Sequence, residues 1–422
     1  MSEEREPLAL FEGYGVEIEY MVVSRADREI RSVVPALLDD LDTHPSPDVR
    51  GAVHPEGRVE WSNELVAHVA EAKCAEPEPD LAAFVEPLNR GVDHVNTLLV
   101  PRGACLMPSA AHPWMDPARD PDLWPRAYHE IYEEYDRIFG CATHGWTNLQ
   151  SVHLNLPFHP GHTAPDGEGE FGRLHAAVRL VLPLVPALAA ASPYLDGRFT
   201  GLLDARMQHY RYNSMAVPAM TGDLIPEAVF TPDAYRRDIL EPIYAQSAPL
   251  DPTGILRDEW ANARGAIARF DRNAIEIRVA DSQEYPLADL AVCFAVAGAV
   301  RLLTEEKLAP YTWQKRWSVA RLYRLFFDAV RDAERAEVLD PDYAALFGVL
   351  RPRATFGDLW ASLLSRPELQ SPVFQSWFDV YRRHGTLARR LLARAGTEPD
   401  REALRGLAGD LCACLAEKKA LV

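Results

Sequence analysis

Three short segments of this 422-residue chain alternate apolar residues with ionisable or amide residues. They are residues 16–20 (VEIEY), 152–156 (VHLNL) and 275–279 (IEIRV). Strict alternation is typical of a β-strand, in which side chains two positions apart project from the same face. Each segment is therefore predicted to be a strand with one apolar face and one polar face.

The polar faces of these strands carry residue types that bind cations and anions. The pairs that share a face are Glu17 with Glu19, His153 with Asn155, and Glu276 with Arg278. One interpretation is a sheet with one solvated face. The other is a shared cavity, because adjacent carboxylates repel unless a cation lies between them and hard cations such as Mg²⁺ take oxygen ligands. An arginine beside them suits a carboxylate or a phosphate group. The three strands taken together favour a site.

A fourth segment, residues 60–71 (EWSNELVAHVAE), has an ambiguous periodicity. On a helix, Glu64, His68 and Glu71 would lie on one face, because they are spaced four and three residues apart. On a strand, Glu64 and His68 would face one way and Glu71 the other. A solvated helix remains an alternative to a functional role.

Five sequence blocks in order resemble the carboxylate–amine ligase branch of the glutamate–cysteine ligase superfamily. They are GYGVEIEY from residue 13, WSNELVAH from 61, HPWMDP from 112, HGWTNLQSVHLNLP from 144 and RFDRNAIEIRV from 269. The resemblance implies an α+β, glutamine-synthetase-like fold, in which a curved, mainly antiparallel sheet forms a funnel with helices packed outside. It implies a catalytic body over residues 8–308. The helical pattern of residues 309–422 predicts a C-terminal segment packed on the same domain.

The resemblance also implies a reaction. Such enzymes bind ATP with Mg²⁺ or Mn²⁺, transfer the γ-phosphoryl group to a substrate carboxylate such as that of glutamate, and release phosphate when an amine attacks the acyl phosphate. The chain has no GxxxxGK[ST] motif. Phosphoryl transfer needs positioning and charge neutralisation more than a protein nucleophile, and a cage of carboxylates with bridging cations supplies both.

Roles follow from the resemblance residue by residue. The expected metal ligands are Glu17, Glu19, Glu64, Glu71, His153 and Glu276. The expected nucleotide contacts are His153, Asn155, Arg206 and Arg278. Arg278 is also expected to contact the transferred phosphate, and Arg206, Arg264 and Arg269 are the candidates that would bind the substrate carboxylate.

Composition limits the partners. The formal net charge is −18, which argues against nucleic acid or an anionic membrane as the main partner. We expect small-molecule carboxylate and amine substrates instead, with a homo-oligomer left open. The charged N-terminus does not resemble a signal peptide, and the apolar runs at 180–191 and 287–303 are interpreted as buried helices, so a cytoplasmic location is expected.

Two other functions fit the same residues. A non-catalytic homologue could keep the fold and bind only metal or nucleotide. A metal-dependent hydrolase could use the same carboxylates to activate water, since a set of ligands does not fix the reaction.

Overall fold

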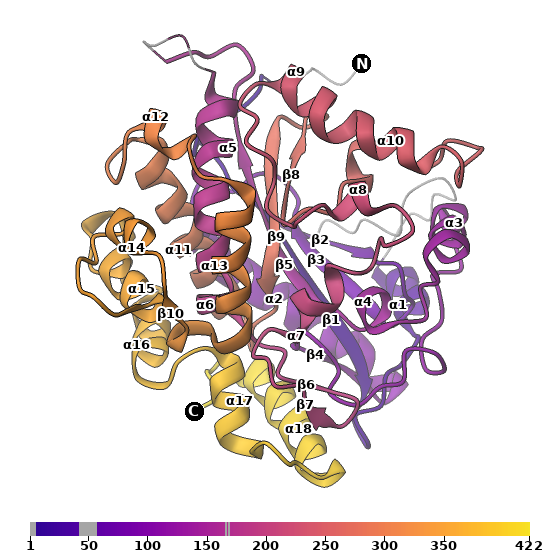
Figure 1. Cartoon of the computed structure of the whole chain (residues 1–422). Helices are drawn as coiled ribbons and strands as arrows, with labels where there is room; N and C mark the ends of the chain where they lie inside the picture. Colours follow the sequence, from indigo (N-terminus) through magenta and orange to yellow (C-terminus); the bar gives the residue numbers. More distant parts are fainter. Residues whose placement is uncertain (1–5, 42–56, 165–166, 168) are drawn as a thin grey trace.

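A seven-stranded sheet forms the centre of the computed structural model, which describes residues 6–41, 57–164, 167 and 169–422 (Figure 1). Six strands follow in the order β2 (Val59–Asn63), β3 (Val69–Cys74), β1 (Gly15–Ser24), β5 (Ser151–Pro157), β9 (Ala274–Asp281) and β8 (Ala266–Arg269). β4 (Ala104–Met107) pairs with the far end of β1. Every pairing is antiparallel, and the sheet is open. The three strands predicted from alternation are confirmed as β1, β5 and β9.

The register of the strands places their polar side chains side by side. Glu17 of β1 lies opposite Lys73 of β3 and His153 of β5. Glu19 lies opposite Glu71, and the register continues across the sheet with Asn155 opposite Glu276. Because directly opposed residues project from the same face of a sheet, these side chains form one polar surface.

The other face of the sheet packs against helices. Its side chains, among them Ile18, Leu154 and Ile277, belong to one apolar core that extends from Val16 to Leu415. Three long helices supply much of the covering layer: α2 (Leu81–Leu99), α5 (Glu170–Val181) and α11 (Pro286–Thr304). In the described part of the chain, α11 alone is long and apolar enough to cross a bilayer, but 78% of that stretch is buried within the protein.

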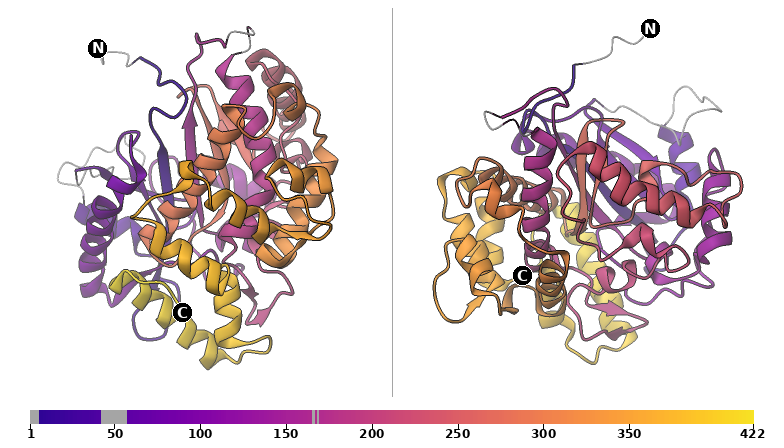
Figure 2. Two further views of the ribbon diagram at one scale, coloured as in Figure 1. Left: turned by 90° about the vertical axis from the view of Figure 1, so that its left-hand side faces the viewer. Right: turned by 45° about the horizontal axis from the view of Figure 1, so that its top comes forward.

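Residues 182–265 form short helices and turns, some of which, around Arg206, Asn213 and Trp260, border the polar face. They include a 3₁₀ turn (Leu182–Leu184), α6 (Pro186–Ala189), the β6–β7 hairpin (Tyr194–Leu195 and Arg198–Phe199), α7 (Ala205–Tyr210), α8 (Pro218–Thr221), α9 (Pro232–Tyr235), a π-helical turn (Arg236–Leu240), α10 (Glu241–Ser247) and a 3₁₀ turn (Glu259–Ala261). The rest of the N-terminal half adds α1 (Val34–Leu41), a 3₁₀ turn (Val100–Arg102), α3 (His129–Phe139) and α4 (His144–Thr147). The right-hand view of Figure 2 shows α9 and α10 across the molecule from the helices near the C-terminus, whereas α6 packs against α13 (Val319–Asp332) of the C-terminal segment.

The C-terminal segment is helical, as its periodicity predicted. It comprises α12 (Tyr311–Gln314), α13 (Val319–Asp332), a 3₁₀ turn (Ala333–Arg335), β10 (Glu337–Val338), α14 (Pro341–Leu346), β11 (Ala354–Thr355), α15 (Phe356–Leu364), a 3₁₀ turn (Pro367–Leu369), α16 (Gln375–His384), α17 (Leu387–Ala395) and α18 (Arg401–Glu417). Side chains cap several of these helices: Ser318 and Asp400 accept hydrogen bonds from backbone N–H groups at the starts of α13 and α18. Such caps satisfy donors that would otherwise lack a partner.

The ambiguous segment is neither a helix nor one continuous strand. Residues 59–74 form the β2–β3 hairpin, in which Ser62 lies opposite Glu71. The helical interpretation of residues 60–71 was therefore wrong, because the loop between Asn63 and Val69 interrupts the periodicity. His68 is fully buried and its Nε2 lies 3.1 Å from the backbone oxygen of Thr147. Burial lowers its pKa to about 3, so His68 is a neutral core residue outside the polar surface.

Candidate active site

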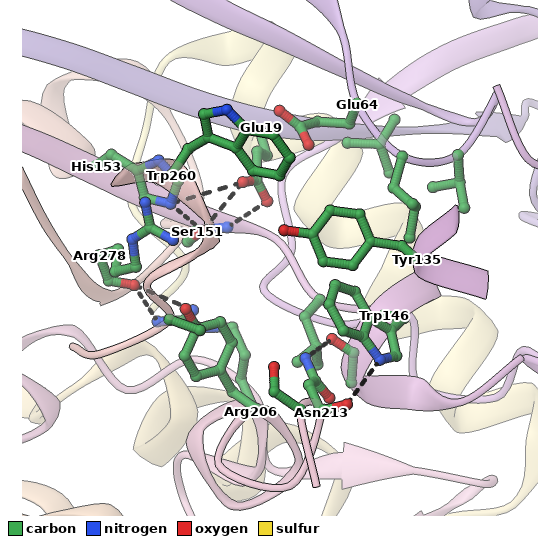
Figure 3. A pocket seen from close by; sticks show the side chains of 18 of the residues that line it. Glu19, Glu64, Tyr135, Trp146, Ser151, His153, Arg206, Asn213, Trp260 and Arg278 are labelled. Atoms are coloured by element: carbon green, nitrogen blue, oxygen red, sulfur yellow. Dashed lines mark hydrogen bonds and ion pairs between the residues drawn. The ribbon is translucent and has the colours of Figure 1, made fainter. Parts of the chain in front are cut away.

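Five glutamates, from β1, β3, β9 and the end of β2, lie on the polar face of the sheet, together with a histidine of β5 and an arginine of β9. Figure 3 shows Glu19, Glu64, His153 and Arg278 of this group. We call this group the carboxylate face: Glu17, Glu19, Glu64, Glu71, Glu276, His153 and Arg278. Glu64 directly follows β2, and the others lie within β1, β3, β5 and β9.

His153 stands at the centre of the carboxylate face. Its Nδ1 lies 3.2 Å from Glu17 Oε2 and 3.7 Å from Glu276 Oε1. Its Nε2 lies 2.9 Å from Ser151 Oγ and 3.8 Å from Glu19 Oε1. Burial opposes the charged imidazolium, but the hydrogen bond that His153 donates to Glu17 and the charges of Glu276 and Glu19 outweigh burial, so the pKa of His153 is raised.

Glu276 and Arg278 form a buried ion pair next to this histidine. The Glu276 side chain is 3% exposed, contacts the Arg278 guanidinium and lies 3.4 Å from Arg269 Nη1. Burial by itself would raise the pKa of Glu276, but Arg278, His153 and Arg269 together lower it. Glu17 has a lowered pKa in the same way: burial opposes its ionisation, and the hydrogen bond and charge of His153 overcome it. Both groups are therefore ionised, with cations already beside them.

The β2–β3 side of the carboxylate face has the opposite electrostatics. Glu71 is buried and accepts hydrogen bonds from Ser62 Oγ at 2.9 Å and Lys73 Nζ at 3.2 Å. Burial nevertheless raises its pKa, and the charge of Glu17 adds to the effect. The pKa of Glu64 is raised well above its usual value by burial and by the charges of Glu71 and Glu19. Negative charge is thus under-compensated on this side.

The donors on the carboxylate face fit a divalent cation. One ligand atom each from Glu17, Glu71 and His153 lie within 4.8 Å of one another. A cation among them would relieve the repulsion that raises the pKa values of Glu64 and Glu71. A set dominated by carboxylate oxygens with one imidazole suits Mg²⁺ or Mn²⁺, and His153 would bind the cation as neutral imidazole after releasing the proton that its raised pKa retains. The residues present therefore match the metal expected from the sequence.

Two cavities meet at the carboxylate face. The smaller has a volume of about 210 Å³ and reaches Glu19, Glu64, His153 and Arg278 from one end of the strands. The larger has a volume of about 960 Å³ and reaches Glu17, Glu71 and Glu276 from the other end, together with Asn155 and Arg269. Glu64, His153, Arg278 and Trp260 line both cavities, which therefore adjoin at the carboxylate face. A further cavity of about 330 Å³ reaches Glu64 and Glu71 beside Lys73.

Three of the four arginines singled out from the sequence line the cavities at the carboxylate face. Arg278 and Arg269 line the larger cavity, and Arg278 and Arg206 line the smaller one. Arg206 is held by Asp281 and by the backbone oxygen of residue 278.

Arg264 is not brought to the carboxylate face. Its guanidinium pairs with Glu227 at 2.7 Å and donates to the backbone oxygen of Ala219 at 2.9 Å, and it lines neither cavity. The placement of Arg264 in the substrate site was therefore wrong, because a partner 37 residues earlier in the chain takes up its charge.

Several residues that contact the carboxylate face were not singled out from the sequence, among them Ser62, described above, and Ser151, Lys73 and Arg272. Ser151 donates its backbone N–H to Glu19 at 2.9 Å and its hydroxyl at 3.1 Å. Lys73 contacts Glu71, and Arg272 Nη1 lies 3.6 Å from Glu17. Ser151 and Lys73 each lie two residues from a selected side chain on the same strand, so extending the alternation would have found them. Arg272 lies in the β8–β9 turn, where no periodicity marks it.

Comparison with known proteins identifies relatives of this chain. A family model described as glutamate–cysteine ligase family 2 matches residues 14–350. An uncharacterized protein of Archaeoglobus fulgidus is 36% identical over 250 residues, which cover 59% of this chain and 65% of that protein, so the match spans slightly less than two thirds of the relative.

A solved structure of glutamate–cysteine ligase from Francisella tularensis in complex with AMP has the same fold. It is 11% identical and superimposes with a TM-score of 0.61 over 95% of this chain and 88% of that one. The mainly antiparallel, glutamine-synthetase-like fold predicted from the sequence is confirmed. With the family model matching most of its length, the chain belongs to glutamate–cysteine ligase family 2.

Proposed function

We propose that this protein is an ATP-dependent carboxylate–amine ligase. A substrate carboxylate oxygen attacks the γ-phosphorus of ATP, so that ADP leaves and an acyl phosphate forms. The nitrogen of an amine then attacks the acyl carbon, the bond to phosphate breaks, and the amine loses a proton. The products are an amide, ADP and inorganic phosphate, and both organic substrates are small molecules.

The observation that carries this proposal is the position of the carboxylate face between two cavities of different size and charge. A phosphoryl transfer needs a donor on one side of a charge-neutralising centre and an acceptor on the other. Glu64, His153 and Arg278, which line both cavities, lie where such a transfer would take place. Membership of a ligase family supports the same reaction class.

The larger cavity suits the nucleotide. Its volume of about 960 Å³ falls in the range of pockets that bury cofactor-sized ligands, whereas about 210 Å³ is too small for one. Lys73, Arg269 and Arg272 line it, and these cations would neutralise the phosphate chain. The AMP bound to the Francisella tularensis ligase is consistent with nucleotide use on this fold.

The residues of the carboxylate face would hold Mg²⁺ or Mn²⁺ through Glu17, Glu71 and His153, with Glu19, Glu64 and Glu276 close by. Bound there, a divalent cation would supply charge stabilisation for the phosphate oxygens. Arg278 is fixed by its ion pair with Glu276, and its side chain lines both cavities. A guanidinium held in this way can donate to a transferring phosphoryl group or to the acceptor carboxylate without reorganising.

The direct test is an assay of ADP release with Mg²⁺ and panels of acids and amines. We expect release to require one acid and one amine together, and Glu17→Gln to reduce it at least about 100-fold, because an ionised group beside His153 is lost. Glu86→Gln is the matched control, since Glu86 is 70% exposed on α2 and pairs only with Arg90 at the surface. The proposal fails if ATP is never consumed and Glu17→Gln leaves nucleotide affinity unchanged. Nucleotide binding without turnover would point to a non-catalytic homologue, and bond cleavage without ATP to a hydrolase.

A further inference from the structure

Two thiols meet where α18 packs against β4. Cys105 lies in β4 and Cys412 in α18, and their Sγ atoms are 3.9 Å apart although 307 residues separate them in the sequence. Cys105 belongs to an apolar cluster that joins this strand to α18, and Cys412 packs against the same cluster. Cys105 is buried and Cys412 is partly exposed, so a small reagent would reach the pair from the side of Cys412.

Positive charge lies beside these thiols. Arg28 is close to α18, because a Cβ atom at Gly409, one turn before Cys412, would lie 3.8 Å from Arg28 Nε. The Arg28 guanidinium donates hydrogen bonds to the backbone oxygens of Ser24 at 3.3 Å and Arg25 at 2.6 Å. Within the described part of the chain, neither arginine forms an ion pair with a carboxylate, so their charge is available to a thiolate.

Cys105 differs from the thiols elsewhere in the protein. The hydrogen bond with Cys412 lowers the pKa of Cys105 to about 7, and the charges of Arg28 and Arg25 add to this effect against burial. Burial instead raises the pKa of each thiol outside the pair, namely those of Cys74, Cys141, Cys293 and Cys414. The thiolate is the nucleophile in disulfide exchange, and reactive cysteines lie in partly exposed, electropositive surroundings. These features make the Cys105–Cys412 pair the reactive one.

We propose that Cys105 and Cys412 form a reversible disulfide that fixes α18 to β4. The oxidant is a small-molecule disulfide. A thiolate of the pair attacks one of its sulfur atoms, so that one small thiol leaves and a mixed disulfide forms. The other cysteine then attacks the protein sulfur of the mixed disulfide and releases the second small thiol. The two cysteines lose two electrons and two protons, which the small disulfide accepts. The inference is independent of the proposed ligase function.

The bond would join the C-terminal helix to the strand next to the carboxylate face. β4 pairs with Met21–Ser24 of β1, the strand that also carries Glu17 and Glu19. To form the disulfide, the Sγ atoms must approach from 3.9 Å to about 2.0 Å. A cross-link between residues so distant in sequence restricts the unfolded chain strongly, so the oxidised protein should be more stable than the reduced protein.

Mass spectrometry of the full-length protein tests the proposal without turnover. The reduced protein is incubated with oxidised glutathione at pH 7, its free thiols are alkylated, and its peptides are compared with and without dithiothreitol. We expect a peptide pair joined through Cys105 and Cys412, a fall in free thiols from six to four, and full reversal by dithiothreitol. The proposal is overturned if both cysteines stay reduced, carry only glutathione or pair with other cysteines.

Matched variants separate the pair from its surroundings. Cys412→Ser should abolish the cross-link, whereas Cys414→Ser, on the same helix, should keep it. Arg28→Gln should slow cross-linking at pH 7 about 2- to 5-fold and move its pH profile upward, because the thiolate loses a neighbouring cation. Arg31→Gln is the control for charge, since Arg31 is exposed and does not contribute to the lowered pKa of Cys105. An unmoved profile in Arg28→Gln would contradict the activation of Cys105.

Thermal denaturation tests whether the bond holds α18 in place. The cross-linked protein should have a Tm about 3–5 °C above that of the reduced protein. Oxidised glutathione should leave the Tm of Cys412→Ser unchanged, because no cross-link can form. A cross-linked protein with the same Tm as the reduced protein would contradict the attachment of α18 to β4.

Discussion

The two halves of the carboxylate face differ in their charge balance. On the β5–β9 side, Glu276 has Arg278, Arg269 and His153 beside it, and its pKa is lowered despite burial. On the β2–β3 side, burial and neighbouring carboxylates raise the pKa values of Glu64 and Glu71, although Lys73 is close. One half is therefore an assembled ion-pair network, whereas the other lacks positive charge. The difference indicates where a metal ion would enter.

The largest expected effect is on the stability of the metal-free protein. Glu276→Gln should lower the free energy of unfolding by about 3–5 kcal/mol, because it leaves buried Arg278 without its main partner. Glu71→Gln should lower the free energy of unfolding far less, or raise it, because it removes a carboxylate whose ionisation is disfavoured by burial and by the charge of Glu17. Urea unfolding in the presence of a chelator measures both. Equal losses in the two variants would show that the halves do not differ.

Divalent cations should stabilise the β2–β3 side of the carboxylate face, where positive charge is lacking. A Mg²⁺ or Mn²⁺ concentration of 100 times the Kd should add about 2.7 kcal/mol to the free energy of unfolding. Glu64→Gln and Glu71→Gln should each remove most of this gain, while Glu86→Gln at the surface should keep it. Thermal denaturation with and without the cation provides the measurement. If the cation stabilised Glu71→Gln as much as it stabilises the unmodified chain, the metal would bind away from Glu71.

The pH dependence of stability should differ in sign between the halves. A carboxyl group with a raised pKa binds its proton more tightly in the folded state, so Glu64 and Glu71 make stability fall as pH rises above about 4.5. Each group lowers the free energy of unfolding by about 1.4 kcal/mol per pH unit until the pH reaches the pKa that the group has in the folded protein. Glu17 and Glu276 have lowered pKa values and lose their stabilising contribution only as pH falls below about 4.5.

Between about pH 5 and pH 7 in chelator, the stability of the unmodified chain relative to Glu71→Gln should therefore fall as pH rises, and saturating Mg²⁺ should flatten this difference. The comparison with the variant isolates the glutamate, because buried His68, whose pKa is lowered to about 3, makes stability rise with pH in both proteins. A difference that stays constant or grows over this range would contradict the charge balance described for Glu64 and Glu71.

The smallest expected effect concerns Arg272, which is 43% exposed and 3.6 Å from Glu17. Arg272→Gln should change the free energy of unfolding by less than about 1 kcal/mol, since partly exposed ion pairs contribute little. It should weaken ATP binding a few-fold, because one cation is lost from the larger cavity. Arg90→Gln on α2, whose pair with Glu86 is exposed, is the matched control. An unchanged ATP affinity would remove Arg272 from the nucleotide site.

The sequence predicted much of the sheet because alternation is a local signal. β1, β5 and β9 could be located from residues 16–20, 152–156 and 275–279 alone, and the resemblance supplied the class of fold. The β2–β3 hairpin was missed because its loop spaces Glu64, His68 and Glu71 like one face of a helix. The antiparallel pairing of residues 59–63 with residues 70–74, in which Ser62 lies opposite Glu71, shows that two strands are present.

The site was less predictable than the sheet because charges are paired across long stretches of chain. Arg264 looks like a substrate ligand until Glu227 is seen to hold it. The aromatic rings of Tyr135, Trp146 and Trp260 line the smaller cavity together, although they lie on three separate segments with no shared pattern. Such contacts depend on tertiary structure and leave no periodic trace in the sequence.

The central claim is that the carboxylate face holds divalent cations between the two cavities. Anomalous diffraction from crystals containing Mn²⁺ and a non-hydrolysable ATP analogue tests it most directly. We expect a manganese peak among Glu17, Glu71 and His153, with the nucleotide in the larger cavity. Nucleotide bound in that cavity with no manganese at these side chains would contradict the account.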